Sequence, residues 1–304
     1  MKTAVFEKAG KVGIENVDKP TIQANDDAII KVVRTCVCGS DLWAYRGLEE
    51  KAEHSENSGH EAIGIVDSVG SEITTVKPGD FVIAPFTHGC GHCAACLAGF
   101  DGDCQSHDDN FSNGVQSEYV RFQHADWALI KVPGQPADYS DEMLNSLLSL
   151  ADVMATGYHA ARVANVKTGD TVVVVGDGAV GLCGVIAAKL RGAKRIIAMS
   201  RHEDRQKLAS EFGATDIIAE RGDEAVEKVM ALTNNAGADA VLECVGTEQS
   251  NDTAMKAGRP GAIVGRVGLP HEPKMDMSSS FYKNTIIAGG PASVTTYDKQ
   301  ILLK

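Results

Sequence analysis

The second half of the chain alternates strictly between short apolar segments typical of strands and amphipathic segments typical of helices. Beyond residue 170 we expect strands at 171–176, 195–199, 216–218, 239–242, 261–265 and 284–288. Helices fill most of the intervals, for example 179–190, 203–212 and 224–232. Strands joined by helices form parallel sheets, because each crossover returns the chain to the same end of the sheet. The pattern predicts a doubly wound α/β domain.

A glycine-rich turn links the first of these strands to the first helix. It reads Gly176-Asp177-Gly178-Ala179-Val180-Gly181, a G-x-G-x-x-G pattern. The first glycine permits the tight turn, the second lets a pyrophosphate approach the backbone, and the third lets the helix pack against the strand. The helix N-terminus then faces the phosphate charge. In this context the turn predicts a dinucleotide site.

The residues at the end of the next strand indicate which dinucleotide this domain binds. NAD-binding domains hold the ribose 2′-hydroxyl with an acidic residue about 20 positions after the glycine turn. Here the strand at 195–199 ends instead at Ser200-Arg201-His202. A serine hydroxyl and a guanidinium suit a 2′-phosphate, and Arg205 lies one helical turn beyond Arg201. The sequence predicts NADP(H), with NAD(H) as the alternative.

The first half of the chain has a different pattern. Its apolar segments, such as 28–33, 62–66 and 80–84, are short and separated by turns, which is typical of a β-rich domain. Helices are then expected over 140–150, with Ser140 as N-cap, and over 154–163. The segment 298–304 reads as the first turns of an amphipathic helix with Asp298 as candidate N-cap. Seven residues are too few to bury its apolar stripe stably.

Four cysteines occur within one short loop. Cys90, Cys93, Cys96 and Cys104 form a C-x2-C-x2-C-x7-C pattern. Four thiolates at this spacing are typical of a closed tetrahedral zinc site, which has no open position. An iron–sulfur cluster is the alternative, although the C-x3-C-P end of that motif is absent. We expect a structural zinc, with His92 and His107 as bystanders.

Composition and charge exclude several classes of protein. Acidic residues number 41 against 29 Lys and Arg, a net charge of −12 that argues against a nucleic-acid partner. No apolar run approaches 18 residues, so no membrane span is expected. The N-terminus lacks the apolar core of a signal peptide, and eight cysteines fit thiols or metal ligands better than disulfides. These features predict a cytoplasmic protein.

Several motifs in one order resemble the zinc-dependent medium-chain alcohol dehydrogenase family. They are Val37-Cys38-Gly39-Ser40-Asp41-Leu42, Gly59-His60-Glu61-Ala62-Ile63-Gly64, Lys77-Pro78-Gly79-Asp80, the four-cysteine loop, the glycine turn and Leu242-Glu243-Cys244-Val245-Gly246. The resemblance covers nearly the whole chain. It implies a GroES-like catalytic domain over 1–150 and a Rossmann domain over 151–290, with 291–304 as an incomplete return to the first domain. Family members continue for several tens of residues, so the chain is expected to be cut short.

The resemblance also implies a second zinc and the residues around it. Cys38, His60 and Asp152 match the family's catalytic zinc ligands, although many relatives have cysteine where Asp152 stands. Glu61 matches a residue that can approach the metal, Asp41 one that orients the ligand histidine, and Ser40 the hydroxyl that passes on the substrate proton. Trp43 stands where the family's proton relay often ends in histidine, so it either shapes an apolar pocket or only packs.

On the coenzyme side, the resemblance places Ser200 where NAD-using relatives carry their acid, and Arg205 where they carry a basic residue near the ribose. Cys244, Val245 and Gly246 match a turn that lines the coenzyme. Together with Gly176, Gly178, Ala179, Val180, Gly181 and Arg201, these are the predicted coenzyme residues.

The implied function is hydride transfer between a small alcohol, or its aldehyde or ketone, and NADP(H), with two zinc ions per chain. The alternatives are an NAD(H)-linked polyol dehydrogenase of the same family and a nucleotide-binding protein impaired by a missing C-terminal segment. A zinc-free reductase of the same fold lacks the Gly-His-Glu and four-cysteine features. A homodimer or homotetramer is expected, through the strand at 284–288. His54, Glu56, His88 and residues 107–110 are expected to face water, and the sequence leaves the substrate open.

Overall fold

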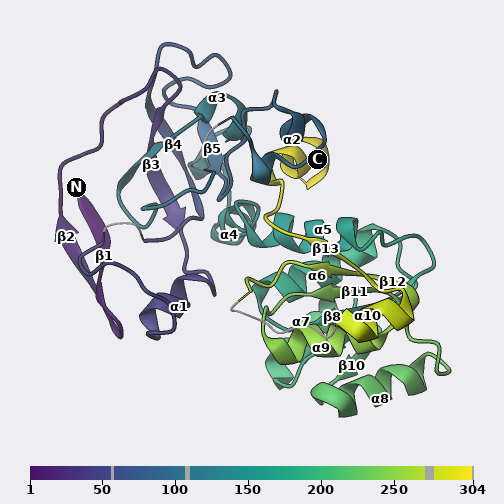
Figure 1. Cartoon of the computed structure of the whole chain (residues 1–304). Coiled ribbons are helices and arrows are strands. Elements are labelled where there is room, and N and C mark those ends of the chain that lie inside the picture. Colours follow the sequence, from purple (N-terminus) through teal and green to yellow (C-terminus); the bar gives the residue numbers. More distant parts are fainter. Residues whose placement is uncertain (56–57, 107–109, 271–276, 303–304) are drawn as a thin grey trace. The chain divides into compact units, whose positions relative to one another are not determined.

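The computed structural model describes residues 1–55, 58–106, 110–270 and 277–302 (Figure 1). It divides into two units. One runs from Met1 to Ala155 and includes the chain from Ala292 onward, and the other runs from Thr156 to Pro291. The division that we expected after residue 150 therefore falls after Ala155, inside the continuous helix α5 (Val153–Val163).

The first unit is built from antiparallel sheets. β1 (Lys2–Lys8) pairs with β2 (Lys11–Asn16), and a five-stranded sheet has the order β6-β3-β4-β5-β7. The strands of that sheet are β3 (Ala28–Thr35), β4 (Ala62–Val69), β5 (Phe81–Ala84), β6 (Tyr119–Phe122) and β7 (Ile130–Lys131). Side chains on one face of it, including Ile30, Val66 and Phe122, form a buried core.

Short helices and turns connect or follow these strands. They are α1 (Asp41–Tyr45), α2 (Ala94–Leu97), α3 (Ala125–Ala128) and α4 (Asp141–Ser149), the 3₁₀ turns η1 (Asp101–Asp103) and η2 (Pro136–Asp138), and, near the C-terminus, α11 (Val294–Tyr297) with the π-helical turn η3 (Asp298–Leu302). As predicted, Ser140 is the N-cap of α4, and its hydroxyl accepts a hydrogen bond from the backbone N–H of Met143.

The second unit is the predicted parallel sheet. Its six strands have the order β10-β9-β8-β11-β12-β13. They are β8 (Thr171–Val175), β9 (Arg195–Met199), β10 (Asp216–Ile218), β11 (Ala238–Glu243), β12 (Gly258–Arg266) and β13 (Ile286–Gly289). The helices are α5, α6 (Ala179–Leu190), α7 (Glu203–Phe212), α8 (Gly222–Leu232), α9 (Glu248–Ala257) and α10 (Met277–Lys283). Buried apolar residues such as Val173, Ile197 and Val241 form its core.

The strand order of this sheet reverses between β8 and β11. The chain moves outward from β8 through β9 to β10, and then returns to the other side of β8 with β11. Right-handed crossovers place the helices of the two halves on opposite faces of such a sheet. Ligands of doubly wound folds bind where the carboxyl ends of the strands meet at this reversal. The glycine turn after β8 and the turn after β11 both lie there.

Two expectations about the C-terminal region were wrong. Asn284 adopts a left-handed backbone conformation (φ 51°), so the edge strand begins at Ile286 and not at residue 284. Asp298 is not an N-cap, because the helix before it already begins at Val294 and Asp298 itself is helical and fully buried. Residues 303 and 304 of the expected helix lie outside the described part of the chain.

The C-terminal segment 292–302 packs against the loop that carries the four cysteines, as its position beside α2 in Figure 1 shows. Ser293 donates a hydrogen bond to the carbonyl of Gly99 (2.9 Å), and Thr295 donates to that of Ala128 (3.0 Å). Thr87 donates to the carbonyl of Ala292 (3.0 Å). Hydrogen bonds from these three hydroxyl groups thus hold the segment against the rest of the first unit. Among the described residues, no helix is both long and apolar enough to cross a membrane.

Candidate metal and coenzyme sites

Three segments far apart in the sequence bring Cys38, His60 and Asp152 together. Cys38 lies in the loop between β3 and α1, His60 comes two residues before β4, and Asp152 lies in the turn before α5. The left-handed backbone of Gly59 (φ 76°) sets the approach to His60, and a Cβ at this glycine would lie 2.4 Å from the side chain of Gln116. Only glycine fits at this position.

The ligand atoms of these three residues and of Glu61 lie within 4.8 Å of one another. His60 Nε2 is 3.2 Å from Asp152 Oδ2, and Cys38 Sγ is 3.8 Å from the same oxygen. Tetrahedral bonds from zinc to nitrogen, oxygen and sulfur place such atom pairs about 3.4–3.6 Å apart. The donor set and its spacing therefore fit one zinc ion.

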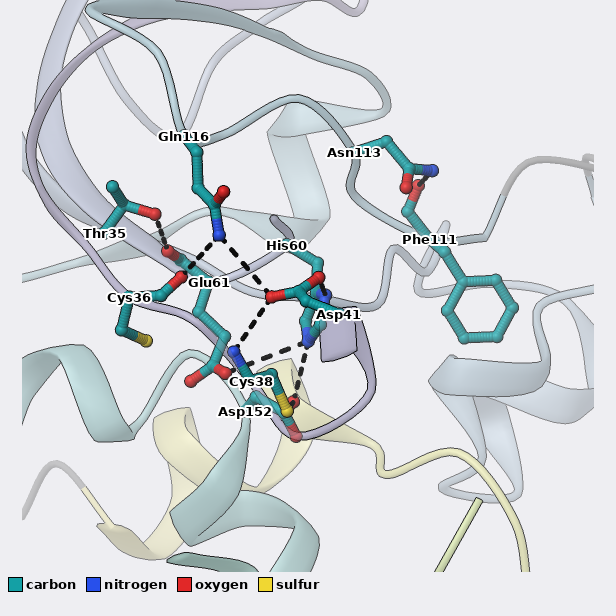
Figure 2. A network of polar contacts seen from close by, with 10 residues as sticks. All are labelled: Thr35, Cys36, Cys38, Asp41, His60, Glu61, Phe111, Asn113, Gln116 and Asp152. Carbon is teal, nitrogen blue, oxygen red and sulfur yellow. Dashed lines mark hydrogen bonds and ion pairs between the residues drawn. The ribbon is translucent and has the colours of Figure 1, made fainter. Parts of the chain in front are cut away.

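Asp41 and Gln116 support this group through polar contacts (Figure 2). Asp41 Oδ2 accepts the backbone N–H of Cys38 (2.9 Å), and its Oδ1 is 3.5 Å from His60 Nδ1. Gln116 Nε2 donates to the carbonyl of Cys36 (2.9 Å) and to Asp41 Oδ2 (3.5 Å). Asp41 thus occupies the place from which a carboxylate fixes the ring of a ligand histidine. Gln116, which the sequence analysis did not single out, connects Asp41 to the Cys36 backbone.

The electrostatics of the group favour a bound cation. Burial would lower the pKa of His60, but hydrogen bonds to Asp152, Asp41 and Cys38 raise it to about 12. Burial and the charge of Asp152 together raise the pKa of Glu61 to about 7, against the opposing charge of His60. Several anionic groups that face one buried point stabilise positive charge there. This is the chemistry that a divalent metal ion needs.

We predict that Gln116→Ala weakens metal binding at this group. The variant removes the amide that links Asp41 to the Cys36 backbone, and loss of groups that orient ligands costs about 10- to 100-fold in metal affinity. Since Gln116 acts through Asp41, the lower end of that range is expected. Competition with a colorimetric chelator measures it.

Gln135→Ala is the matched control. This exposed glutamine of the same unit also donates its amide to a backbone carbonyl, that of Gly79 (3.1 Å), and it belongs to neither metal group. If both variants release zinc like the unchanged protein, Gln116 has no role in holding the metal group.

The four cysteines of the loop also converge. Cys90 Sγ is 3.9 Å from Cys96 Sγ, and Cys93 Sγ is 3.8 Å from Cys104 Sγ. Tetrahedral zinc–sulfur bonds of about 2.3 Å place two sulfurs about 3.8 Å apart, so the spacing fits a single ion. The eight cysteines all lie in the described part of the chain, and none of them forms a disulfide.

Backbone N–H groups favour the thiolate form of two of these cysteines, Cys93 and Cys90, whereas burial raises the pKa of Cys96 and Cys104. N–H groups of Gln105 (3.4 Å) and Cys96 (3.5 Å) point at Cys93 Sγ and lower the pKa of that thiol to about 6. N–H groups of His92 and Cys93 point at Cys90 Sγ in the same way. Donors of this kind stabilise the thiolate, which is the form that binds zinc.

The histidines named in the sequence analysis have varied surroundings. His92 Nδ1 lies 3.0 Å from the carbonyl oxygen of Cys90, and His92 is not part of the converging group of four cysteines. His54 is exposed. His88 does not face water as expected. It is buried beside Phe122, and its Nε2 lies 2.6 Å from Ser112 Oγ, because it follows a buried strand of the sheet. Glu56 and residues 107–109 lie outside the described part of the chain.

The glycine turn has the shape of a phosphate cradle. Gly176 has a left-handed backbone (φ 113°), and a Cβ at Gly181 would lie 2.1 Å from the carbonyl oxygen of Gly176. A Cβ at Gly178 meets no atom within 4 Å. Gly178 is the N-cap of α6 and brings no side chain to that cap. A pyrophosphate can therefore occupy the space beside Gly178 and accept hydrogen bonds from the first N–H groups of α6, those of Ala179 and Val180.

These two glycines are expected to respond differently to alanine. Gly178→Ala places a methyl group in the open space, so coenzyme affinity should fall by about tenfold or more while the unfolding temperature stays unchanged. Gly181→Ala forces the helix away from the strand and should lower the unfolding temperature. Coenzyme titration and thermal unfolding measure the two effects. Undiminished coenzyme binding by Gly178→Ala would exclude this turn as the phosphate site.

The residues expected at the ribose are held by an acid within the glycine turn. Ser200 Oγ donates to Asp177 Oδ2 (3.0 Å), and Arg205 Nη1 donates to Asp177 Oδ1 (2.9 Å). Arg201 is exposed, and its Nε lies 3.4 Å from His202 Nε2. Burial would raise the pKa of Asp177, but Ser200 and Arg205 hold it below its usual value. Sequence reasoning missed Asp177 because it looked for the acid only after the second strand.

The turn after β11 lies against the glycine turn. The backbone N–H of Cys244 donates to the carbonyl of Val175 (3.1 Å), and a Cβ at Gly176 would lie 2.7 Å from Val245 Cγ2. The buried carboxylate of Glu243 accepts the N–H groups of Val245 (2.9 Å) and Gly246 (2.8 Å). Glu243 fixes this turn, although the sequence analysis assigned it no role.

Comparisons with known proteins agree with both units. Residues 24–134 match the family model "Alcohol dehydrogenase GroES-like domain", and residues 179–296 match "Zinc-binding dehydrogenase". The chain is 34% identical over 316 residues to zinc-type alcohol dehydrogenase B of Aspergillus flavus, which covers 99% of this chain and 72% of the relative. It is 35% identical over 278 residues to an NADP-dependent isopropanol dehydrogenase of Clostridium beijerinckii, covering 88% of this chain and 76% of the relative.

Solved structures show the same relationship. The alcohol dehydrogenase TADH of Thermus sp. ATN1 superimposes with a TM-score of 0.86 and 31% identity, covering 100% of this chain and 88% of that one. The fold and the metal group define a two-domain, metal-dependent oxidoreductase. The chain belongs to the zinc-dependent medium-chain alcohol dehydrogenase family. It is therefore an alcohol oxidoreductase that works with zinc and a nicotinamide coenzyme.

Proposed function

We propose that the protein transfers hydride between a small alcohol, or its aldehyde or ketone, and NADP(H). The observation that carries the proposal is the convergence of the ligand atoms of Cys38, His60, Glu61 and Asp152 in a member of this family. Three protein ligands and one open position are typical of catalytic zinc sites, and Cys38, His60 and Asp152 supply three such ligands with the carboxylate of Glu61 close by. The four-cysteine group offers four sulfur ligands to one ion, so its proposed role is to stabilise the loop and not to take part in catalysis.

Each residue of the site has a proposed part. Cys38, His60 and Asp152 would hold zinc, and Glu61 lies close enough to approach it. Asp41 orients His60 through Nδ1, and Ser40 Oγ passes the substrate proton onward. When bound, zinc supplies a Lewis acid at the substrate oxygen, and the nicotinamide ring gives or takes the hydride.

Aromatic rings beside the metal group favour a small, largely apolar substrate. The ring of Phe86 lies edge-on to His60 (centroids 6.0 Å apart), and Phe111 lies against Phe86 (6.2 Å). Trp43, half-buried in α1, stands where relatives often carry a histidine and has no group that accepts a proton. We assign it to the substrate pocket, and the proton relay then ends at another group.

Ser200, Arg201 and Arg205 support the preference for NADP(H) over NAD(H). They lie at or just after the carboxyl end of β9, where the residue that holds the ribose is expected, and no acid stands in that segment before Glu203. The open first turn of α6, together with the turn over Cys244, Val245 and Gly246, would bind the rest of the coenzyme. The relative from Clostridium beijerinckii is named as NADP-dependent.

A turnover screen tests the proposed function. A panel of small alcohols, polyols, aldehydes and ketones would be assayed with NADPH and NADH, before and after chelation. We expect a higher kcat/KM with NADPH, loss of activity on chelation and recovery on addition of zinc. Chelator-resistant turnover would support a zinc-free reductase instead, and coenzyme binding without turnover would support an impaired nucleotide-binding protein.

We also propose that copies of the chain associate as a homodimer or homotetramer through β13. This strand lies at the edge of the six-stranded sheet, and the side chain of Ile286 on it is 53% exposed. An edge strand presents unpaired backbone groups that a second copy can satisfy. Light scattering that gives the mass of a single chain at micromolar concentration would contradict this proposal.

A further inference from the structure

The acid of the glycine turn, Asp177, contacts the residues that stand where this fold distinguishes the two coenzymes. NAD and NADP differ only at the ribose 2′ position, which carries a hydroxyl in NAD and a phosphate in NADP. In this fold a residue at the end of the second strand reads that position. Here that residue is Ser200, and the carboxylate of Asp177 is 3.0 Å from its hydroxyl. A negative charge thus stands beside the residue expected to face the 2′ position, although it comes from another turn.

The contacts of Asp177 have opposite consequences for the two coenzymes. A ribose 2′-hydroxyl is a hydrogen-bond donor, and Asp177 can accept it while keeping Arg205. A 2′-phosphate needs hydrogen-bond donors and positive charge. To bind Ser200 and Arg205, it must break the hydrogen bonds that these two residues donate to Asp177 (3.0 and 2.9 Å). The phosphate also carries a charge of about −1.5 to −2, which the carboxylate repels.

The Asp177–Arg205 pair is poised for such an exchange. The side chain of Arg205 is 50% exposed and that of Asp177 is 15% exposed, so the ion pair is partly solvated. Partly exposed pairs contribute little to stability, and a ligand can replace one partner at modest cost. Ser200 and Arg205 hold the pKa of Asp177 below its usual value despite the opposing effect of burial, so its carboxylate is charged at neutral pH.

We infer that Asp177 is a specificity-determining residue for the coenzyme: its carboxylate favours a ribose with a free 2′-hydroxyl and weakens the binding of one with a 2′-phosphate. The inference rests on the proposed function, because it assumes that Ser200 and Arg205 face the adenosine ribose. The inference limits the size of the proposed preference for NADP(H) over NAD(H). The two arginines and the serine give NADP(H) only a small advantage as long as Asp177 is present.

The test compares the affinities of two adenosine fragments, which requires neither turnover nor zinc at the catalytic group. Calorimetry would give the dissociation constants of adenosine 2′,5′-bisphosphate and of 5′-AMP for the full chain and for Asp177→Asn. Both fragments share the 5′-phosphate, so the ratio of their constants isolates the 2′ position. We expect the variant to shift this ratio by about tenfold toward the bisphosphate, the size of one hydrogen bond to a charged group. NADPH and NADH titrations should shift in the same direction.

Two further variants complete the experiment. Asp177→Ser retains a small polar side chain and guards against misfolding of the asparagine variant, which thermal unfolding would reveal. Asp252→Asn is the matched control, because Asp252 is an exposed acid of the same unit that pairs with Lys256 on α9 (2.8 Å). A ratio that stays within twofold of the unchanged protein in both Asp177 variants, or that shifts toward 5′-AMP, overturns the inference.

These measurements test the role of Asp177 and the proposed coenzyme preference separately. If the unchanged protein prefers NADH, the proposed NADP(H) preference fails. The shift caused by Asp177→Asn still decides the role of Asp177, since it is measured as a change between two proteins.

Discussion

Replacing Cys38 with serine is expected to lower kcat/KM by about a thousandfold or more while the protein stays folded. Cys38 is the one cysteine of this four-residue group, and its Sγ lies 3.8 Å from Asp152 Oδ2. A serine hydroxyl is a poor zinc ligand because it is not ionised at neutral pH, so two ligands and Glu61 would remain. Loss of a ligand should exceed the 10- to 100-fold effect that follows loss of a group that only orients one.

Metal analysis and thermal unfolding complete this prediction. The unchanged protein should contain two zinc ions per chain and the variant one. The unfolding temperature should change little, because Cys38 is only partly buried and lies outside the apolar core of its unit. Cys183→Ser is the matched control, since this thiol of α6 belongs to neither metal group. Unchanged turnover in Cys38→Ser would remove the catalytic metal assignment.

Replacing Cys104 with serine is expected to have the largest effect on stability. The loop around the four cysteines has little apolar core of its own, because Leu97 is 76% exposed and Phe100 is 41% exposed. We therefore expect the order of this loop to depend on a zinc ion bound by the four sulfurs. Structural zinc in small sites contributes about 10–16 kcal/mol of binding free energy, so the unfolding temperature should fall by about 10 °C or more.

The damage should extend to the C-terminal segment. Ser293 is hydrogen-bonded to Gly99 of this loop, and the buried Asp298 lies on the same segment. When the loop loses its metal, residues 292–302 lose the surface on which they pack. Hydrogen exchange should show faster exchange in this segment, and metal analysis should show one zinc ion fewer. A Cys104→Ser protein that keeps both ions and melts like the parent would show that the loop is not a structural zinc site.

The sequence by itself determined those features that depend on residues close together in the chain. The runs of apolar residues, the Ser140 cap and the glycine turn are local signals, and they predicted β8, α6 and α4 correctly. The four cysteines span 15 residues, so their spacing alone indicated a common metal. Local signals suffice in these cases because short segments have few conformations that satisfy their side chains and backbone.

Only the tertiary structure decided which distant residues meet. Cys38 and Asp152 are 114 positions apart, and the sequence analysis joined them through family resemblance and not through spacing. The contact of Asp177 with Ser200 and Arg205, the link from Gln116 to Asp41 and the burial of His88 were not anticipated. Such contacts depend on strand order and register, which bring distant segments of the chain together. The number of residues between two such segments does not indicate whether they lie close in space.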